Sequence, residues 1–121
     1  MSEAVLLAEM SDRRGAFARP RRVRLYSDRL EVEEEGRLAA RLSLTAITEL
    51  RLTVEPAGRE AQVVARAFGP GGTKIAFGSL SAAGPGRWEN NAAGFRSVAV
   101  ALLEQLAAQE TPTRCEEGPR L

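Results

Sequence analysis

Six arginines crowd one short segment of the chain and could together bind an anion. They fall within twelve residues that contain no acidic side chain: Arg13, Arg14, Arg19, Arg21, Arg22 and Arg24. A guanidinium group presents planar, paired donors that match the oxygens of phosphate and carboxylate groups. The segment therefore predicts a site for a phosphate ligand or for an anionic lipid surface.

A second interpretation is that these arginines are ordinary surface cations. Arginine is the default basic residue of this chain, because Lys74 is the single lysine among 17 basic residues. This usage, with abundant alanine, indicates a bacterial source with a GC-rich genome. An acidic run follows that could neutralise the cluster across a hairpin or in a neighbouring subunit. It consists of Asp28, Glu31, Glu33, Glu34 and Glu35.

The chain lacks the residue types that most often carry acid–base and nucleophilic catalysis. It has no histidine, and its one cysteine, Cys115, lies in a polar C-terminal tail. Three successive carboxylates, Glu33 to Glu35, come just before Gly36, where we expect a solvated hairpin tip. Zinc binding through a cysteine and histidine cluster is also excluded. The sequence therefore favours a protein that is not an enzyme and that needs no metal or cofactor.

The segment GPGRWENN, residues 84–91, combines the only tryptophan with polar side chains that could contact a ligand. Its glycines lack the spacing and the following Lys-Ser/Thr of a phosphate-binding P-loop. We interpret it as an irregular connection between the last strand and a helix, with Trp88 against the rim of the sheet. The alternative is ligand contact through Arg87 and Trp88, since loops collect binding residues.

The composition predicts one domain over residues 1–110 and a disordered polar tail over residues 111–121. Apolar residues make up 44% of the chain and aromatic residues only 5%, so the core must be mostly aliphatic. A formal net charge of +1 gives no overall attraction to nucleic acid. The apolar run at residues 4–8 is too short to span a membrane. With one cysteine, these features predict a cytoplasmic protein.

Alternating apolar side chains predict six strands, with a seventh near the N-terminus at residues 3–10. The six cover residues 23–26, 30–33, 38–44, 47–55, 60–68 and 73–79. Val5 and Leu7 would face inward in the N-terminal strand, and Leu50, Leu52 and Val54 in the fourth of the six. A turn at residues 56–58 would end that strand, because proline and glycine interrupt regular pairing.

A change of period then predicts one helix over residues 91–108. Its larger apolar residues recur at helical spacing and form one buried stripe. They are Phe95, Val98, Leu102, Leu103 and Leu106. Asn90 or Asn91 would cap the helix, because an asparagine side chain accepts from the free N–H groups of the first turn.

This order of elements resembles the pleckstrin-homology-like (PH-like) fold, and in particular the small bacterial PH-like domains. The resemblance covers roughly residues 20–108. It depends on the segments VRLYSDRLEV (residues 23–32) and LSLTAITELR (residues 42–51) and on the helix from Phe95 to Leu106. It implies a mainly β (α+β) fold. About seven antiparallel strands would form a bent barrel that one C-terminal helix caps.

The resemblance also implies two functions. Bacterial PH-like domains resemble protein-binding or oligomerising modules, so we expect a protein partner or self-association. An exposed edge strand and the separation of the arginines from the acidic run would both suit such a contact. The alternative is binding of an anionic lipid or phosphate, because Arg22-Val23-Arg24 matches the basic strand end of PH domains that bind phosphoinositides.

Overall fold

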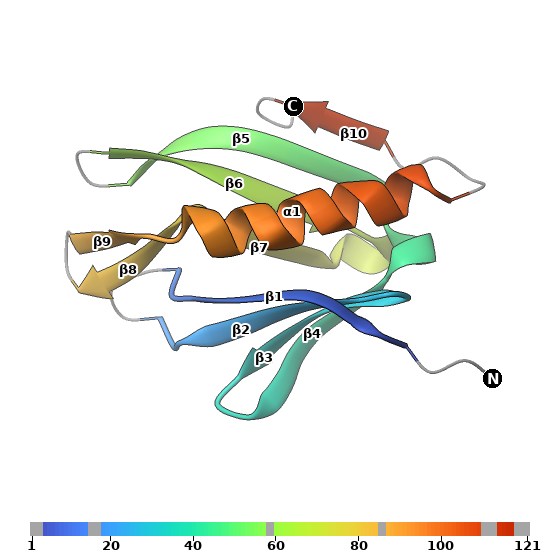
Figure 1. The fold of residues 1–121 in the computed structure, drawn as a ribbon, viewed down its shortest axis with the longest axis horizontal. Coiled ribbons are helices and arrows are strands. Elements are labelled where there is room, and N and C mark those ends of the chain that lie inside the picture. Colours follow the sequence, from blue (N-terminus) through green and yellow to red (C-terminus); the bar gives the residue numbers. More distant parts are fainter. Residues whose placement is uncertain (1–3, 15–17, 58–59, 85–86, 110–113, 118–121) are drawn as a thin grey trace.

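The structure is a computed structural model that describes residues 4–14, 18–57, 60–84, 87–109 and 114–117. The described residues form ten strands in three sheets, with one long helix (Figure 1). The first sheet is antiparallel, in the order β1-β2-β3-β4. Its strands are β1 (Leu6–Asp12), β2 (Arg21–Tyr26), β3 (Arg29–Glu34) and β4 (Arg37–Ser43).

The first sheet is built on the alternation seen in the sequence. Val23 and Leu25 of β2 lie opposite Val32 and Leu30 of β3, and all four side chains are buried. Period two puts these residues on one face, which becomes the core face of the sheet. The expected hairpin between β2 and β3 is therefore confirmed.

The acidic run ends at the tip of the next hairpin. Glu35 and Gly36 connect β3 to β4 with φ angles of 50° and 78°. Two successive residues with positive φ form the tight turn that matches the twist of paired strands, and glycine favours this conformation.

The second sheet has the order β10-β5-β6-β7, and only β10 runs parallel to its neighbour. The strands are β5 (Glu49–Ala57), β6 (Glu60–Phe68), β7 (Lys74–Gly78) and β10 (Arg114–Glu117). Two short 3-10 turns, Leu44–Ala46 and Pro70–Gly72, join β4 to β5 and β6 to β7.

The connection that we expected to be irregular is a hairpin, so that expectation was wrong. Strands β8 (Leu80–Gly84) and β9 (Arg87–Asn90) pair antiparallel, with Ala82 opposite Trp88. In the sequence, the Pro-Gly pair at residues 85–86 falls between the two strands. Residues 85–86 lie outside the described residues, and Trp88 lies half-buried on β9.

Helix α1 (Ala92–Ala107) packs on the first sheet, mainly against β1 and β2. The expected stripe is confirmed in its main members, since Val98, Leu102 and Leu106 are buried, and Phe95 and Leu103 are partly buried. In Figure 1 the helix lies across the opening between β1 and the second sheet. Asn91 occupies the N-cap position, as one of the two expected alternatives, but its side chain makes no capping hydrogen bond. The Asn90 Oδ1 instead accepts from the Ala92 N–H at 2.8 Å.

One hydrophobic core joins both main sheets and the helix. It combines buried residues of the first sheet, Ile75 and Phe77 of β7, and the buried stripe of α1. The rings of Phe77 and Phe95 lie 5.6 Å apart, which is an ordinary distance for a tilted aromatic pair.

The N-terminal segment is a strand, as expected, but the expected inward residues were wrong. Val5 and Leu7 are 60% and 40% exposed, whereas Met10 and Asp12 are buried. The register shifts between Leu6 and Ala8, where β1 carries a bulge against β2. A bulge adds one residue to a strand, so the alternation that begins at Val5 does not continue into β1.

The inward residues expected in β5 were also partly wrong. Leu50 is buried, but Val54 is 73% exposed, and the polar residues Glu49 and Arg51 are only 8% exposed. The strand also continues through Pro56 to Ala57 instead of ending before them. A proline is tolerated here because β5 is paired by β6 on one side and has no paired strand beyond Leu52 on the other, within the described residues.

The mainly β architecture with a C-terminal helix is confirmed, whereas the described strands form three sheets and no closed barrel. Part of the tail expected to be disordered, Arg114–Glu117, forms β10 beside β5. A polar segment can add to a sheet edge because main-chain hydrogen bonds supply the pairing. Residues 111–113 and 118–121 of that tail lie outside the described residues.

Candidate functional site

A buried ion pair lies at the centre of the arginine-rich region. Asp12, at the end of β1, accepts two hydrogen bonds from Arg21, at the start of β2. The Nε–Oδ1 distance is 2.8 Å and the Nη2–Oδ2 distance is 3.0 Å, so the contact is bidentate. The Asp12 side chain is 0% exposed. This pairing satisfies two charges that would otherwise be costly to remove from water.

The same arginine also joins the two main sheets. Arg21 Nη2 donates to the main-chain oxygen of Ala76 in β7 at 2.6 Å. Arg21 therefore bridges a carboxylate of the first sheet and a carbonyl of the second. A residue that we expected to bind a ligand instead carries a structural contact.

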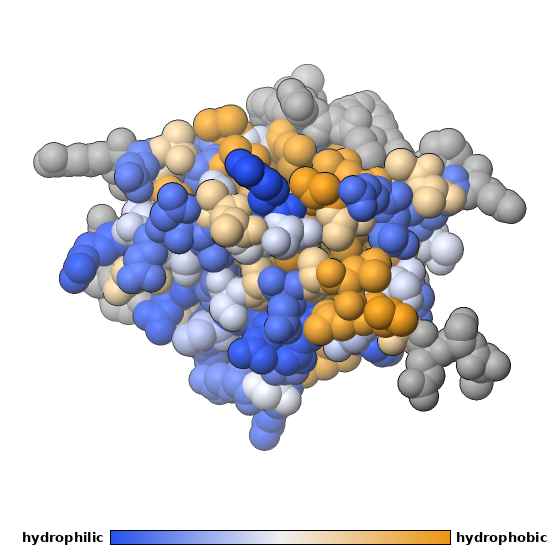
Figure 2. Space-filling model, in the orientation of Figure 1, coloured by the Kyte–Doolittle hydropathy of each residue, from blue (hydrophilic) through white to orange (hydrophobic). Residues whose placement is uncertain are grey.

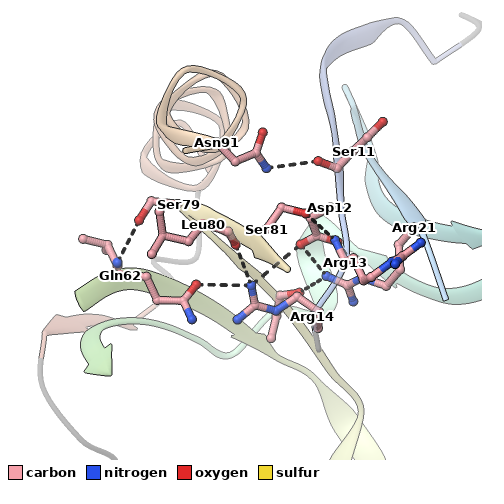
Figure 3. Close-up of polar contacts among 12 residues, drawn as sticks. Ser11, Asp12, Arg13, Arg14, Arg21, Gln62, Ser79, Leu80, Ser81 and Asn91 are labelled. Carbon is pink, nitrogen blue, oxygen red and sulfur yellow. Dashed lines mark hydrogen bonds and ion pairs between the residues drawn. The ribbon is translucent and has the colours of Figure 1, made fainter. Parts of the chain in front are cut away.

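Arg14 extends this polar network toward the second sheet (Figure 3). Its Nη1 donates to Gln62 Oε1 and to the Leu80 carbonyl, both at 3.3 Å, and lies 4.0 Å from Asp12 Oδ2. Burial lowers the pKa of the Arg14 guanidinium, and the charge of Asp12 opposes that effect. Gly78 leaves the room for this contact, because a Cβ there would lie 2.7 Å from Arg14 Nη1.

Further hydrogen bonds fasten the β8-β9 hairpin and the helix to the end of β1. The Arg13 N–H donates to Ser81 Oγ at 2.8 Å, and the Arg13 carbonyl accepts from the Ala82 N–H at 2.8 Å. Asn91, at the start of α1, donates through Nδ2 to the Ser11 carbonyl at 3.0 Å (Figure 3). The end of β1 therefore touches every main part of the fold.

Two more of the six arginines are engaged by the acidic run. Arg24 pairs with Glu33 at 2.7 Å and with Glu9 at 3.3 Å, and Arg19 pairs with Glu35 at 3.2 Å. The Glu9 hydrogen bond is the main cause that raises the pKa of Arg24. All three ion pairs are at least partly exposed, so they add little stability and leave the charges screened by solvent.

Arg13 and Arg22 are the members of the cluster whose side chains make no ion pair within the described residues. Arg22 is exposed and Arg13 is half-buried. Both line an open groove of about 640 Å³ between the β1-β2 end of the first sheet and the β8-β9 hairpin. Four carboxylates line the same groove: Asp12, Glu33, Glu35 and Glu89. The groove is therefore of mixed charge.

Arg87 and Trp88, the second predicted contact, do not line this groove. Arg87 is exposed and Trp88 is half-buried on β9, while their neighbours Glu89 and Asn90 reach the groove. The hairpin thus contributes to the groove through residues that follow the tryptophan.

An apolar face lies elsewhere on the molecule, where the start of β1 meets α1. We define the apolar face as Val5, Leu6 and Leu7 with Val100, which are between 40% and 60% exposed. Figure 2 shows hydrophobic side chains gathered over this end of β1 and over the helix above it. Exposed apolar side chains that gather on one surface commonly mark a protein contact.

A second polar cluster occupies the outer face of the second sheet. Glu55 of β5 accepts hydrogen bonds from Arg66 of β6, one of them 2.9 Å long, and from Thr53. These interactions, with Arg66 the largest cause, hold the pKa of Glu55 at about 2, below its ordinary value of 4.5.

Within the described residues, histidine, cysteine and acidic side chains form no group of three or more that could hold a metal ion. No helix in the described part of the chain is long and apolar enough to cross a membrane. Comparison of the chain with family models, with curated proteins and with solved structures gave no match.

The sequence interpretation missed the residues that engage the arginines from outside the cluster. Asp12, Gln62 and Ser81 come from three different strands. Asp12 carried a usable signal, because it follows Met10 at a spacing of two and therefore shares the inward face of β1. Gln62 and Ser81 carried none, since only the packing of the two sheets and the hairpin brings them to Arg14 and Arg13.

The buried ion pair predicts a large loss of stability when its acid is neutralised. Asp12→Asn keeps the size of the side chain but leaves the Arg21 charge without a buried partner. We expect the free energy of unfolding to fall by about 3–5 kcal/mol, measured by urea denaturation at neutral pH. Arg19→Gln removes an exposed pair and is the control, with an expected change below about 1 kcal/mol. Equal small changes in both variants would contradict the assignment.

The lowered pKa of Glu55 predicts a pH-dependent effect of Glu55→Gln. A depressed pKa in the folded state means that the carboxylate stabilises the fold above its ordinary pKa of 4.5 and loses this effect as the pH falls toward about 2. The variant should therefore have a lower Tm than the wild type at neutral pH, and the gap should close between these two pH values. Glu60→Gln, at an exposed carboxylate of β6, is the control. A gap that stays constant down to pH 2 would refute the role of ionisation.

Proposed function

We propose that this chain is a non-enzymatic PH-like module that binds protein, with self-association as its simplest form. The observation that carries the proposal is the apolar face, in which three successive residues at the start of an edge strand and one residue of the helix are exposed. A binding role needs no catalytic group, and the chain has no histidine.

The order of the elements supports the PH-like assignment. An antiparallel sheet of β1 to β4 is followed by the antiparallel strands β5, β6 and β7 and then by α1 near the C-terminus. This is the order that the resemblance implies, with the β8-β9 hairpin inserted before the helix. Fold alone assigns no function, so the functional proposal depends on the surface.

The bulge in β1 explains why this surface is apolar. In a regular strand either Leu6 or Leu7 would turn toward the core, but the register shift leaves both at least 40% exposed. Bulges often occur where a strand re-aims its side chains for a contact. Val100 is a further exposed apolar residue, on α1, which packs against β1.

The internal use of the arginines favours protein contact over anion binding. Arg14, Arg19, Arg21 and Arg24 have acidic or main-chain partners within the chain. A charge that is already paired must lose its partner before it can bind a phosphate. The exposed leucines, by contrast, gain free energy whenever a partner removes them from water.

The apolar face predicts concentration-dependent dimerisation that depends on its leucines. We expect light scattering after size exclusion to show a mass that rises between micromolar and millimolar protein. The double variant Leu6→Ser with Leu7→Ser should weaken the dimer by a factor of about one hundred or more, because each buried leucine contributes about 1.5–3 kcal/mol.

Leu38→Ser is the matched control, since Leu38 is 56% exposed on β4 and lies outside the apolar face. It should leave the association unchanged. A mass that stays monomeric at every concentration would overturn self-association. Equal weakening by Leu38→Ser would show that the apolar face is not the contact.

Binding of a phosphate-bearing ligand is the second candidate, and it depends on Arg13 and Arg22 in the groove. These two charges have no ionic partner among the described residues, and Arg22 is exposed. The start of α1 at Asn91 adds the positive end of the helix dipole to the same groove. The acidic residues of the lining oppose an anion and limit the expected affinity.

The second candidate predicts that Arg22→Ala weakens binding to anionic surfaces. The probes are vesicles of phosphatidylcholine with and without phosphatidylserine, and inorganic phosphate in solution. Loss of one cation near an anionic surface should lower the partition constant for the vesicles by about fivefold, since each cation contributes about 1 kcal/mol. Arg96→Ala, at an exposed arginine of α1, is the control. If inorganic phosphate displaces the protein from the vesicles, the ligand is a free anion. If Arg22→Ala and Arg96→Ala weaken vesicle binding equally, the groove is not the binding site.

A further inference from the structure

The edge of β5 is closed by a strand from the end of the chain. Strand β10 pairs in parallel with β5 and forms the outer edge of the second sheet. Figure 1 shows it along β5, and it packs mainly on that strand. β10 is four residues long, whereas β5 is nine.

Strand β10 and Pro56 together protect the edge of β5 from pairing with another chain. β10 pairs with Glu49 to Leu52 only. Farther along β5 stands Pro56, which has no N–H group and therefore cannot donate to an added strand. Without β10 the first half of β5 would present unpaired main-chain groups, and such an edge readily pairs with another chain.

The pairing register favours the sequence of this chain's own tail. Arg114 stands opposite Glu49, and Glu116 stands opposite Arg51, so the residue types alternate in sign along both strands. Glu49 and Arg51 are each 8% exposed, and Arg51 Nε donates to Glu49 Oε2 at 2.9 Å. Opposite charges at facing positions stabilise a strand pair, and like charges there destabilise it.

We propose that β5 also accepts the Arg114–Glu117 strand of a second copy of this chain, so that two copies exchange their C-terminal strands. The exchanged pair makes the same main-chain hydrogen bonds as the closed chain. The closed monomer and the strand-exchanged dimer then differ mainly in the connection between α1 and β10 and in the effective concentration of β10 at the β5 edge. A strand of four residues that is paired on one side only, among the described residues, opens at low cost, and a high protein concentration favours the exchanged form.

This strand exchange uses β5 and β10, whereas the proposed function uses β1 and α1. It does not depend on the apolar face. To keep the two apart, every chain in the test carries Leu6→Ser and Leu7→Ser, which remove the contribution of that face.

The test uses two full-length chains whose edges and tails are mismatched. The tail-reversed chain carries Arg114→Glu and Glu116→Arg, and the edge-reversed chain carries Glu49→Arg and Arg51→Glu. Each tail then opposes its own β5 but complements the β5 of the other chain. Native mass spectrometry of an equimolar mixture should show a mixed dimer about tenfold more abundant than either homodimer.

A chain with all four charge substitutions is the control, because its own tail matches its own edge again. Mixed with the tail-reversed chain, it should form no enriched mixed dimer. If the two mismatched chains are folded by circular dichroism and yield no mixed dimer, the proposal is overturned. An enriched dimer that also appears with the control overturns it too.

The edge substitutions replace a buried pair and could prevent folding of that chain. A second measurement therefore uses only the tail-reversed chain and a synthetic peptide of residues 112–119, whose cysteine is kept in the reduced state. We expect the peptide to bind this chain at least about tenfold more tightly than a peptide with both charges reversed. Equal affinities, or the absence of binding, would overturn the proposal.

Discussion

The ion pair between Asp12 and Arg21 is the contact on which the arrangement of the fold depends. It is bidentate and buried, and its arginine also donates to Ala76 of the second sheet. A buried charge must have its partners in place, so the end of β1, the start of β2 and β7 are held in one relative position. The contacts of Arg13 and Arg14 then attach the β8-β9 hairpin to the same point.

This use of the arginines changes how the surface is interpreted. The sequence suggests anion binding by the six arginines, but most of them pair with other groups of the chain. Of the six, only Arg13 and Arg22 have no ionic partner among the described residues. The exposed leucines of β1 then become the more distinctive surface. The β5 edge is the site of the second proposed contact, which would be made through the main chain at positions whose charges alternate.

The elements with strong local patterns could be predicted, and those that depend on long-range pairing could not. The β2-β3 hairpin and the helix follow from periods of two and 3.6 residues over uninterrupted segments. The bulge at Leu7 breaks that period, so the inward face of β1 was assigned wrongly. Val54 was expected to be buried because it alternates with Leu52, yet burial depends on what covers a sheet face, and Val54 is 73% exposed.

The sequence by itself determined a mainly β domain with one amphipathic helix, because side-chain periodicity decides which faces must leave water. It also determined that neither histidine nor a cysteine cluster could supply chemistry. Only the tertiary structure decided which charges are available. Arg14 reaches Gln62, 48 positions away, because the two main sheets pack against each other, and Arg21 reaches Ala76 for the same reason. Whether an arginine binds a ligand or the protein itself depends on such contacts, which no local pattern records.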